Sequence, residues 1–150
     1  MYIPREPENM KDLFYKALSF YGLEEITGEQ HNPEILAMFA EIGHDWVQDD
    51  ETSWCSAFIS YLCKQLEYER SGELTARSWL KIGKELTKPE IGCIVVLWRG
   101  SVNSWKGHVG FYVNHDSRYV YILGGNQDNS VCVKRYPKNK VLGYRKLKKL

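Results

Sequence analysis

The chain has 150 residues, of which 43% are hydrophobic, 13% aromatic and 26% charged. This composition predicts one globular domain over residues 1–150 and excludes a disordered or collagen-like chain. No apolar run approaches the roughly 18 residues that cross a bilayer. Residues 1–12 lack the apolar region of a secretory signal, so we expect synthesis in the cytoplasm.

The net charge of +1 comes from 20 basic and 19 acidic residues, and such a balance argues against binding to nucleic acid. The balance hides a division, because residues 1–75 hold 15 acids and 5 bases whereas residues 76–150 hold 4 acids and 15 bases. One interpretation is a basic face that binds an anionic polymer. The other is that the two halves attract each other across one domain, with a solvated basic tail over residues 145–150.

Four helices are expected in the first half of the chain. The second has the clearest boundaries, because Asn32 can cap it, Pro33 suits its first turn and Gly43 can end it. The first has apolar residues spaced three and four apart, and the third begins after Thr52 or Ser53, either of which can cap it. The expected ranges are about 9–22, 33–42, 52–66 and 76–82.

After Pro89 the hydrophobic period becomes that of β-strands, and turn residues separate the segments. The expected strands are 91–98, 109–114, 119–123, 131–136 and 141–147. Helices followed by an antiparallel sheet predict an α+β fold. We expect a helical part over about residues 9–83 and a sheet of about five to six strands over about 90–147.

Cys55 is the first candidate catalytic residue. It follows a polar stretch in ETSWCSAF (51–58) and falls in the first turn of the third expected helix. The positive end of a helix dipole and a nearby imidazole both lower the pKa of a thiol, and the amides of that turn can stabilise an oxyanion. The alternative is a buried structural cysteine, because cysteine is among the most buried residue types.

His108 is the candidate base, at the start of a strand in KGHVGFYV (106–113). A cysteine at a helix start followed by such a histidine is the order of nucleophile and base in papain-like enzymes. If three residues, 116–118, connect the next two strands, Asn126 faces His108. Its side-chain amide can then hold the imidazole in the tautomer that accepts a proton from the thiol. An even-length loop places Gly125 there instead, and a bulge at Gly124 and Gly125 is then needed.

Five blocks of the chain together resemble the NlpC-type and CHAP-type cysteine peptidases and amidases, and the resemblance extends from about residue 11 to 144. The blocks are ETSWCSAF (51–58), ARSWLKIG (76–83), PEIGCIVVLWRG (89–100), GHVGFYV (107–113) and ILGGNQ (122–127). The resemblance implies a papain-like α+β fold and hydrolysis of an amide bond in peptidoglycan, without metal or cofactor. It assigns Cys55 as nucleophile, His108 as base and Asn126 as the third member. Cys93 departs from the family, many of whose members have an acidic residue there.

Three further residues are candidates for substrate binding. Trp54, beside the nucleophile, and Trp105, in the loop before His108, either line a groove or pack in the core. Asp50 either binds the amino group of a stem peptide or caps the third helix. Cys93 and Cys132 lie on expected strands, where they form a disulfide or stay free thiols.

These residues together predict a monomeric peptidoglycan hydrolase with a Cys-His-Asn mechanism, acting as endopeptidase or amidase. It would act at the cell wall or in the periplasm after release or secretion, as a phage lysin or a wall enzyme does, and bind neither nucleic acid nor membrane. One alternative is a secreted cysteine hydrolase toxin that acts on another amide and has an immunity protein as partner. The other is a non-catalytic module that binds the cell wall.

Overall fold

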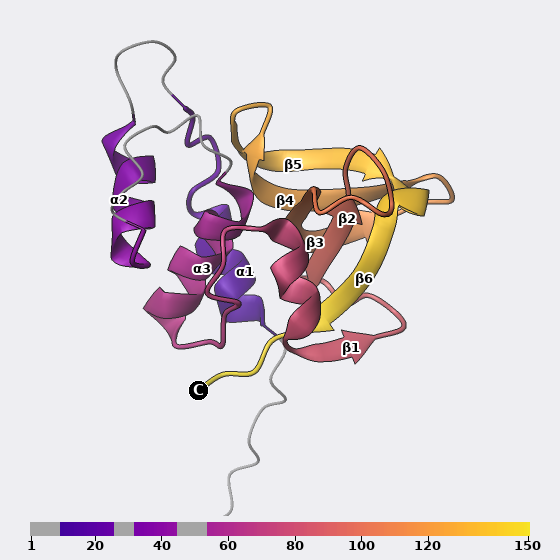
Figure 1. Ribbon diagram of the computed structural model, residues 1–150, viewed down its shortest axis with the longest axis horizontal. Coiled ribbons are helices and arrows are strands. Elements are labelled where there is room, and N and C mark those ends of the chain that lie inside the picture. The colour runs from indigo at the N-terminus through magenta and orange to yellow at the C-terminus, as the bar shows by residue number, and fades with distance from the viewer. Residues whose placement is uncertain (1–9, 26–31, 45–53) are drawn as a thin grey trace, which may run out of the picture.

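The computed structural model describes residues 10–25, 32–44 and 54–150, and in this part of the chain helices pack beside one antiparallel sheet (Figure 1). This arrangement confirms the predicted α+β fold, with the α-helices before the strands in the chain. The helices are α1 (Lys11–Leu18), α2 (Pro33–Glu41), α3 (Cys55–Leu66) and the short 3₁₀ helices η1 (Ala76–Lys81) and η2 (Lys138–Lys140). The strands are β1 (Lys84–Leu86), β2 (Ile94–Trp98), β3 (Gly107–His115), β4 (Tyr119–Gln127), β5 (Ser130–Pro137) and β6 (Val141–Lys146).

Local sequence sets the boundaries of the helices. The Asn32 side chain accepts a hydrogen bond of 2.9 Å from the Glu34 amide, as expected of the cap of α2, and Gly43 follows the helix with a positive φ of 88°. The helix α1 ends at Leu18, earlier than predicted, and farther along Gly22 donates its amide to the Val131 carbonyl. This bond draws the chain toward β5 and away from the helical path.

The six strands have the order β1-β6-β2-β3-β4-β5, and every neighbouring pair is antiparallel. Two features differ from the sequence prediction. The three-residue edge strand β1 is additional, and β4 continues to Gln127 where a turn was expected from Gly124. A bulge between Gly124 and Gln127 lets the strand stay paired with β5, so the residues after the two glycines remain part of the sheet.

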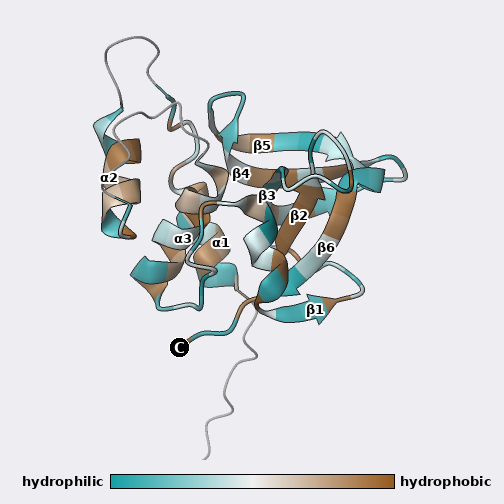
Figure 2. Cartoon of the chain, viewed as in Figure 1, coloured by the Kyte–Doolittle hydropathy of each residue, from teal (hydrophilic) through white to brown (hydrophobic). Residues whose placement is uncertain are grey.

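The alternation of side chains divides the core between the two faces of the sheet. One face, with Val96, Phe111 and Leu123, packs on the helices, among which α3 contacts both β3 and β4. Figure 2 shows the hydrophobic residues along β2 and in α1 and α2. The opposite face carries a second cluster that includes Val95 and Leu97. The helix α3 is therefore fixed against the middle of the sheet, which places its first turn close to the ends of β3 and β4.

A polar contact joins α1 to the C-terminal segment. The Tyr68 hydroxyl donates a hydrogen bond to the Asp12 carboxylate, and the Lys149 ammonium lies 3.0 Å from the other carboxylate oxygen. Partial burial alone would raise the pKa of Asp12, but the bonds from Tyr68, Lys149 and the Leu13 amide outweigh it and hold that pKa below its ordinary value. The ionised form of Asp12 is thus favoured in the folded protein.

Because the pKa of Asp12 is lowered on folding, its contribution to stability is present at neutral pH and is lost as pH falls below about 4. We expect Asp12→Asn to lower the free energy of unfolding at pH 7 by up to about 1 kcal/mol and to make it less sensitive to acid. Urea denaturation between pH 3 and pH 7 measures both effects. Glu85→Gln, the same charge change on exposed β1, is the matched control. An equal effect of the two substitutions would contradict the assignment to this contact.

Candidate active site

Cys55 is the first residue of α3, and its exposed fraction is only 2%. The first backbone bond within the helix runs from the Phe58 amide to the Trp54 carbonyl, at 2.9 Å. The amides of Cys55, Ser56 and Ala57 precede this bond, at the end of the helix where partial positive charge accumulates. The thiol therefore stands where a helix favours a thiolate and, after attack on a carbonyl, an oxyanion.

The first turn of α3 is attached to η1 through a buried serine. The Ser56 hydroxyl donates to the Glu73 carbonyl at 2.8 Å and accepts from the Trp79 indole at 2.8 Å. Both Ser56 and Trp79 are fully buried. Through these two hydrogen bonds, Trp79 of η1 and the Glu73 carbonyl fix the backbone immediately beside Cys55.

Trp54 is a core residue, which corrects the expectation that it lines a substrate groove. Its exposed fraction is 1%, and its ring meets Phe58 edge-on at 6.3 Å between centroids. A Cβ at Gly125 of β4 would lie 2.6 Å from the Trp54 ring, so the strand backbone packs directly on the indole. The indole N–H donates to the Glu25 carboxylate. Trp54 thus sets the distance between α3 and β4.

His108 lies near the start of β3, opposite Leu97 of β2, and its Nε2 is 2.8 Å from Oε1 of Gln127. Gln127 is 1% exposed, and its amide nitrogen donates to the Ile122 carbonyl at 3.0 Å and the Cys132 carbonyl at 2.6 Å. Two acceptors for the amide nitrogen leave the amide oxygen to face His108 as an acceptor. The proton of a neutral His108 ring therefore sits on Nε2, and Nδ1 is the position that can accept a proton.

The hydrogen bond to His108 comes from Gln127, which corrects the prediction of Asn126 as the third member. The register expected for a three-residue loop at 116–118 is correct in the middle of the hairpin, where Phe111 pairs with Leu123 and Tyr112 with Ile122. Beyond that point the β4 bulge intervenes, and Asn126 takes a left-handed conformation with φ 58°. Such a residue interrupts the alternation of the strand, and the next side chain turns toward His108.

Tyr136 of β5 is a residue of the site that the sequence prediction missed. Its ring lies over His108, with 5.1 Å between centroids and 30° between planes. Burial raises the pKa of the Tyr136 hydroxyl, and the Cys55 and Cys132 thiols raise it further, so the phenol is neutral at neutral pH. Tyr136 thus covers one side of the candidate base, His108. In the sequence it is one of ten tyrosines and carries no motif.

A cavity of about 200 Å³ opens at Cys55. Its other lining residues are Leu74, Thr75, Ala76, Arg99, Trp105 and Gly107. Trp105 is 70% exposed and forms an outer wall of the cavity, and its role in substrate binding stays a prediction. The Trp105 loop is held by Arg77, whose guanidinium donates to the carbonyls of Ser101, Val102 and Lys106 at 2.8–2.9 Å. Asp50, the other expected binding residue, lies outside the described residues.

The other three cysteines do not line this cavity. All four thiols are free, so Cys93 and Cys132 do not form a disulfide. Burial raises the pKa of Cys93 to about 12 and raises that of Cys63 as well, which makes both poor nucleophiles. Cys132 is half-buried, with its thiol 3.4 Å from the Gln127 carbonyl. Cys55 is thus the thiol that lines this cavity, whereas Cys63 lines a separate pocket of about 370 Å³ with Tyr68 and Leu150.

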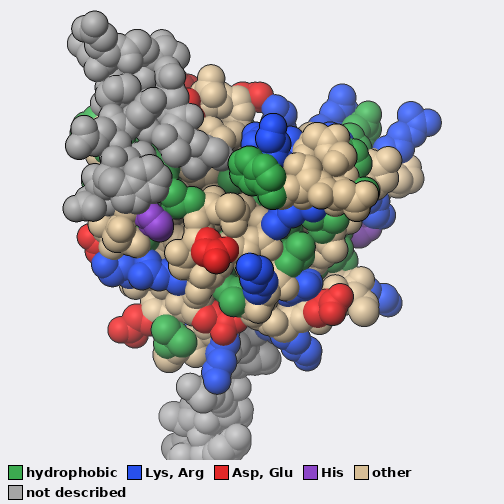
Figure 3. Space-filling model, viewed as in Figure 1, with side chains coloured by type: hydrophobic (Ala, Val, Ile, Leu, Met, Phe, Trp, Pro, Cys, Tyr) green, Lys and Arg blue, Asp and Glu red, His purple; other side chains and the backbone are tan. Residues whose placement is uncertain are grey.

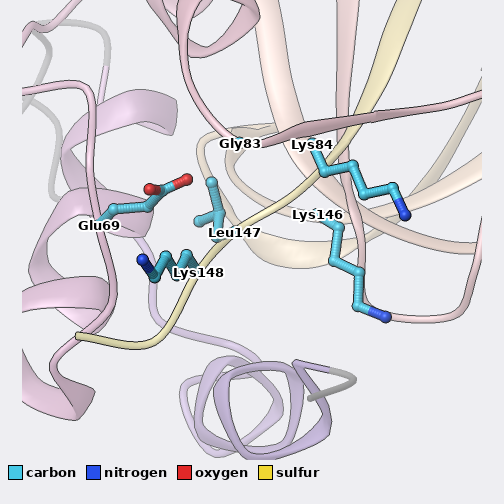
Figure 4. Close-up of a pocket in the computed structure, with 6 residues that line it drawn as sticks. All are labelled: Glu69, Gly83, Lys84, Lys146, Leu147 and Lys148. Atoms are coloured by element: carbon cyan, nitrogen blue, oxygen red, sulfur yellow. The ribbon is translucent and has the colours of Figure 1, made fainter. Parts of the chain in front are cut away.

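A larger pocket lies elsewhere, between the C-terminal segment and the start of β1 (Figure 4). Its volume is about 530 Å³, and Glu69 and three lysines are among its lining residues. Neither Cys55 nor His108 lines it, whereas Cys55 and Gly107, the residue before His108, line the smaller cavity, so we choose the smaller cavity as the candidate site. Within the described ranges no cluster of three or more His, Cys, Asp or Glu residues is arranged to hold a metal ion, and no helix is long and apolar enough to cross a membrane.

No family model matches the chain, and no curated protein matches its sequence. The resemblance carried by the blocks around Cys55 and His108 therefore remains a prediction.

We expect Gln127→Ala to lower the turnover rate on a cleavable substrate roughly tenfold or more, because His108 loses the acceptor that fixes its tautomer. KM should change little, because Gln127 is buried away from the substrate cavity. Asn126→Gly is the matched control: it removes the neighbouring amide and keeps a residue that tolerates positive φ. Steady-state kinetics and thermal midpoints of both variants make the comparison. Equal loss in the two variants, or a loss explained by unfolding, would contradict the assignment.

Proposed function

We propose that the protein is a thiol hydrolase that cleaves an amide bond of peptidoglycan, as an endopeptidase or as an amidase. The observation that carries this proposal is the His108–Gln127 hydrogen bond on the two strands, β3 and β4, against which α3 packs with Cys55 at its start. The anchored Gln127 amide leaves Nδ1 of His108 as the proton acceptor, and the ring of Tyr136 lies over His108. These are the parts that a thiol mechanism requires.

In this mechanism His108 takes the thiol proton on Nδ1, and the Cys55 thiolate attacks the carbonyl carbon of the amide. The negative oxygen that forms is stabilised by the amides at the start of α3. The carbon–nitrogen bond then breaks as His108 gives its proton to the leaving amine. A water molecule, deprotonated by His108, attacks the thioester, and the acid product leaves while Cys55 regains its proton.

Three properties support peptidoglycan as the substrate. The five sequence blocks resemble peptidoglycan hydrolases, and Trp105 gives the cavity an exposed aromatic wall suited to a sugar or peptide. The second half of the chain has an excess of 11 bases over acids, and in Figure 3 many Lys and Arg side chains lie on the right-hand side of the molecule, where Figure 1 places the sheet. An anionic wall polymer would be attracted to this side of the molecule, and that attraction should weaken with salt.

We expect Cys55→Ala and His108→Ala each to abolish the loss of turbidity of purified cell walls. Cys55→Ala removes the nucleophile, and His108→Ala removes the group that accepts and returns the proton. A chelator should not affect the wild-type rate. Cys63→Ala and His115→Ala are matched controls, since Cys63 is a buried thiol elsewhere on α3 and His115 lies at the far end of β3. Full activity of the Cys55 variant would refute the mechanism.

Mass spectrometry of the released fragments separates the two reactions. Sugar chains without peptides would identify an amidase, and divided stem peptides an endopeptidase. Release of no fragment, with Cys55 still reactive, would instead favour a toxin that acts on another amide and has an immunity protein. Failure of iodoacetamide to label Cys55 at neutral pH would favour a module that only binds the wall. Neighbouring genes for a holin, a secretion system or a small inhibitor would distinguish the routes by which the protein reaches its target.

A further inference from the structure

The cavity at Cys55 has an uneven distribution of charge. Among its described lining residues Arg99 is the only one with an acidic or basic side chain. Within the described ranges no carboxylate forms an ion pair with Arg99. The start of α3 adds the partial positive charge of a helix N-terminus on the same cavity. A negatively charged group is therefore favoured there.

The nearby Arg77 shows by contrast what a structural arginine looks like in this protein. Its guanidinium donates to three backbone carbonyls, so its hydrogen-bonding capacity is used to hold the loop from Ser101 to Lys106. Arg99 lies at the base of the same loop, where its amide donates to the Lys106 carbonyl at 3.2 Å, and its side chain is exposed. The backbone of Arg99 is thus held in place, but its side chain does not hold the loop as the side chain of Arg77 does.

The remaining walls limit what the cavity accepts. Leu74 and Ala76 are apolar, Trp105 is a large aromatic, and Gly107 presents backbone with no side chain. A Cβ at Gly107 would lie 2.7 Å from the Leu97 carbonyl, so this wall cannot easily carry a larger residue. A volume of about 200 Å³ is below that of most pockets for whole ligands, and suits a single amino-acid unit.

We propose that Arg99 determines specificity by binding a free carboxylate on the substrate unit next to the scissile amide bond. The guanidinium matches a carboxylate through two parallel hydrogen bonds, which an amidated unit cannot reproduce. The protein therefore prefers walls whose stem peptides keep their acidic groups over walls in which those groups are amidated. The inference rests on the proposed function in one respect: Cys55 is the nucleophile that meets the bound unit.

Alkylation of Cys55 tests the inference without any wall substrate. Iodoacetate and iodoacetamide have nearly the same size and both give a thioether as the thiolate displaces iodide, but only iodoacetate carries a carboxylate. We expect Arg99→Gln to slow the reaction of Cys55 with iodoacetate about tenfold while leaving the iodoacetamide rate within about twofold. Arg99→Lys should restore much of the iodoacetate rate. Rates are read from the Cys55 peptide by mass spectrometry.

Two internal controls accompany the measurement. Cys132 reports the ordinary ratio of the two reagents, because it is half-buried and does not line the cavity. Lys106→Gln removes an equal charge from the same loop at a residue that does not line the cavity, so it should leave the Cys55 ratio unchanged. An equal effect of Lys106→Gln would show a general field and would overturn the inference.

The remaining outcomes also decide the matter. If Arg99 acts only by lowering the pKa of Cys55, Arg99→Gln slows both reagents in parallel, and the inference is wrong. Resistance of Cys55 to both reagents also overturns it, because the cavity then admits not even a two-carbon acid. Failure of the proposed function looks different: walls stay intact while the ratio still depends on Arg99. Failure of the inference alone leaves wall hydrolysis active on acidic and amidated walls alike.

Discussion

The orientation of one buried amide determines the tautomer of His108 in the candidate site. Gln127 has two backbone carbonyls as acceptors for its amide nitrogen, from Ile122 on its own strand and from Cys132 on the neighbouring strand. A reversed amide would place its oxygen against two carbonyl oxygens in a buried position, which is costly because each would lose a partner. The oxygen therefore faces His108, and the tautomer of the imidazole follows from the pairing of β4 with β5. The sheet thus orients the proposed base, His108, whereas the proposed nucleophile, Cys55, belongs to α3.

Packing and hydrogen bonding together hold the start of α3, which carries the proposed nucleophile Cys55. Trp54 rests on the backbone at Gly125, and Ser56 joins the first turn of α3 to Trp79 of η1. Both contacts flank Cys55, so α3 cannot slide along the sheet without breaking one of them. The loop with Trp105 is attached to η1 through Arg77. The wall of the cavity and the nucleophile are thus fixed to the same short helix.

Much of the fold could be predicted from the sequence, because its determinants are local. The cap at Asn32, the glycine at 43 and the change of period after Pro89 identify helices and strands without knowledge of their packing. Cys55 and His108 could be chosen for the same reason, since a helix start and a strand start are local features.

The third member of the site could not be predicted, because its identity depends on a bulge that shifts the alternation by one residue. GGNQ does contain a hint: asparagine tolerates positive φ, so the residue after it can turn to the face that simple counting gives to Asn126. Tyr136 was beyond prediction, because only the pairing of β4 with β5 brings it over His108.

The crowding around the end of β4 limits how this sequence can diverge over evolutionary time. An added Cβ would meet the Gln127 side chain at Gly124 and the Trp54 ring at Gly125, and at Gly110 it would meet Ile122 at 2.3 Å. These three positions must stay without side chains as long as the site is kept, whereas exposed residues of the sheet and helices can change freely. A distant relative would therefore be detected less by overall sequence identity than by a short sequence pattern. That pattern is His-x-Gly on one strand and, on the next, Gly-Gly followed by a residue that adopts positive φ and then glutamine.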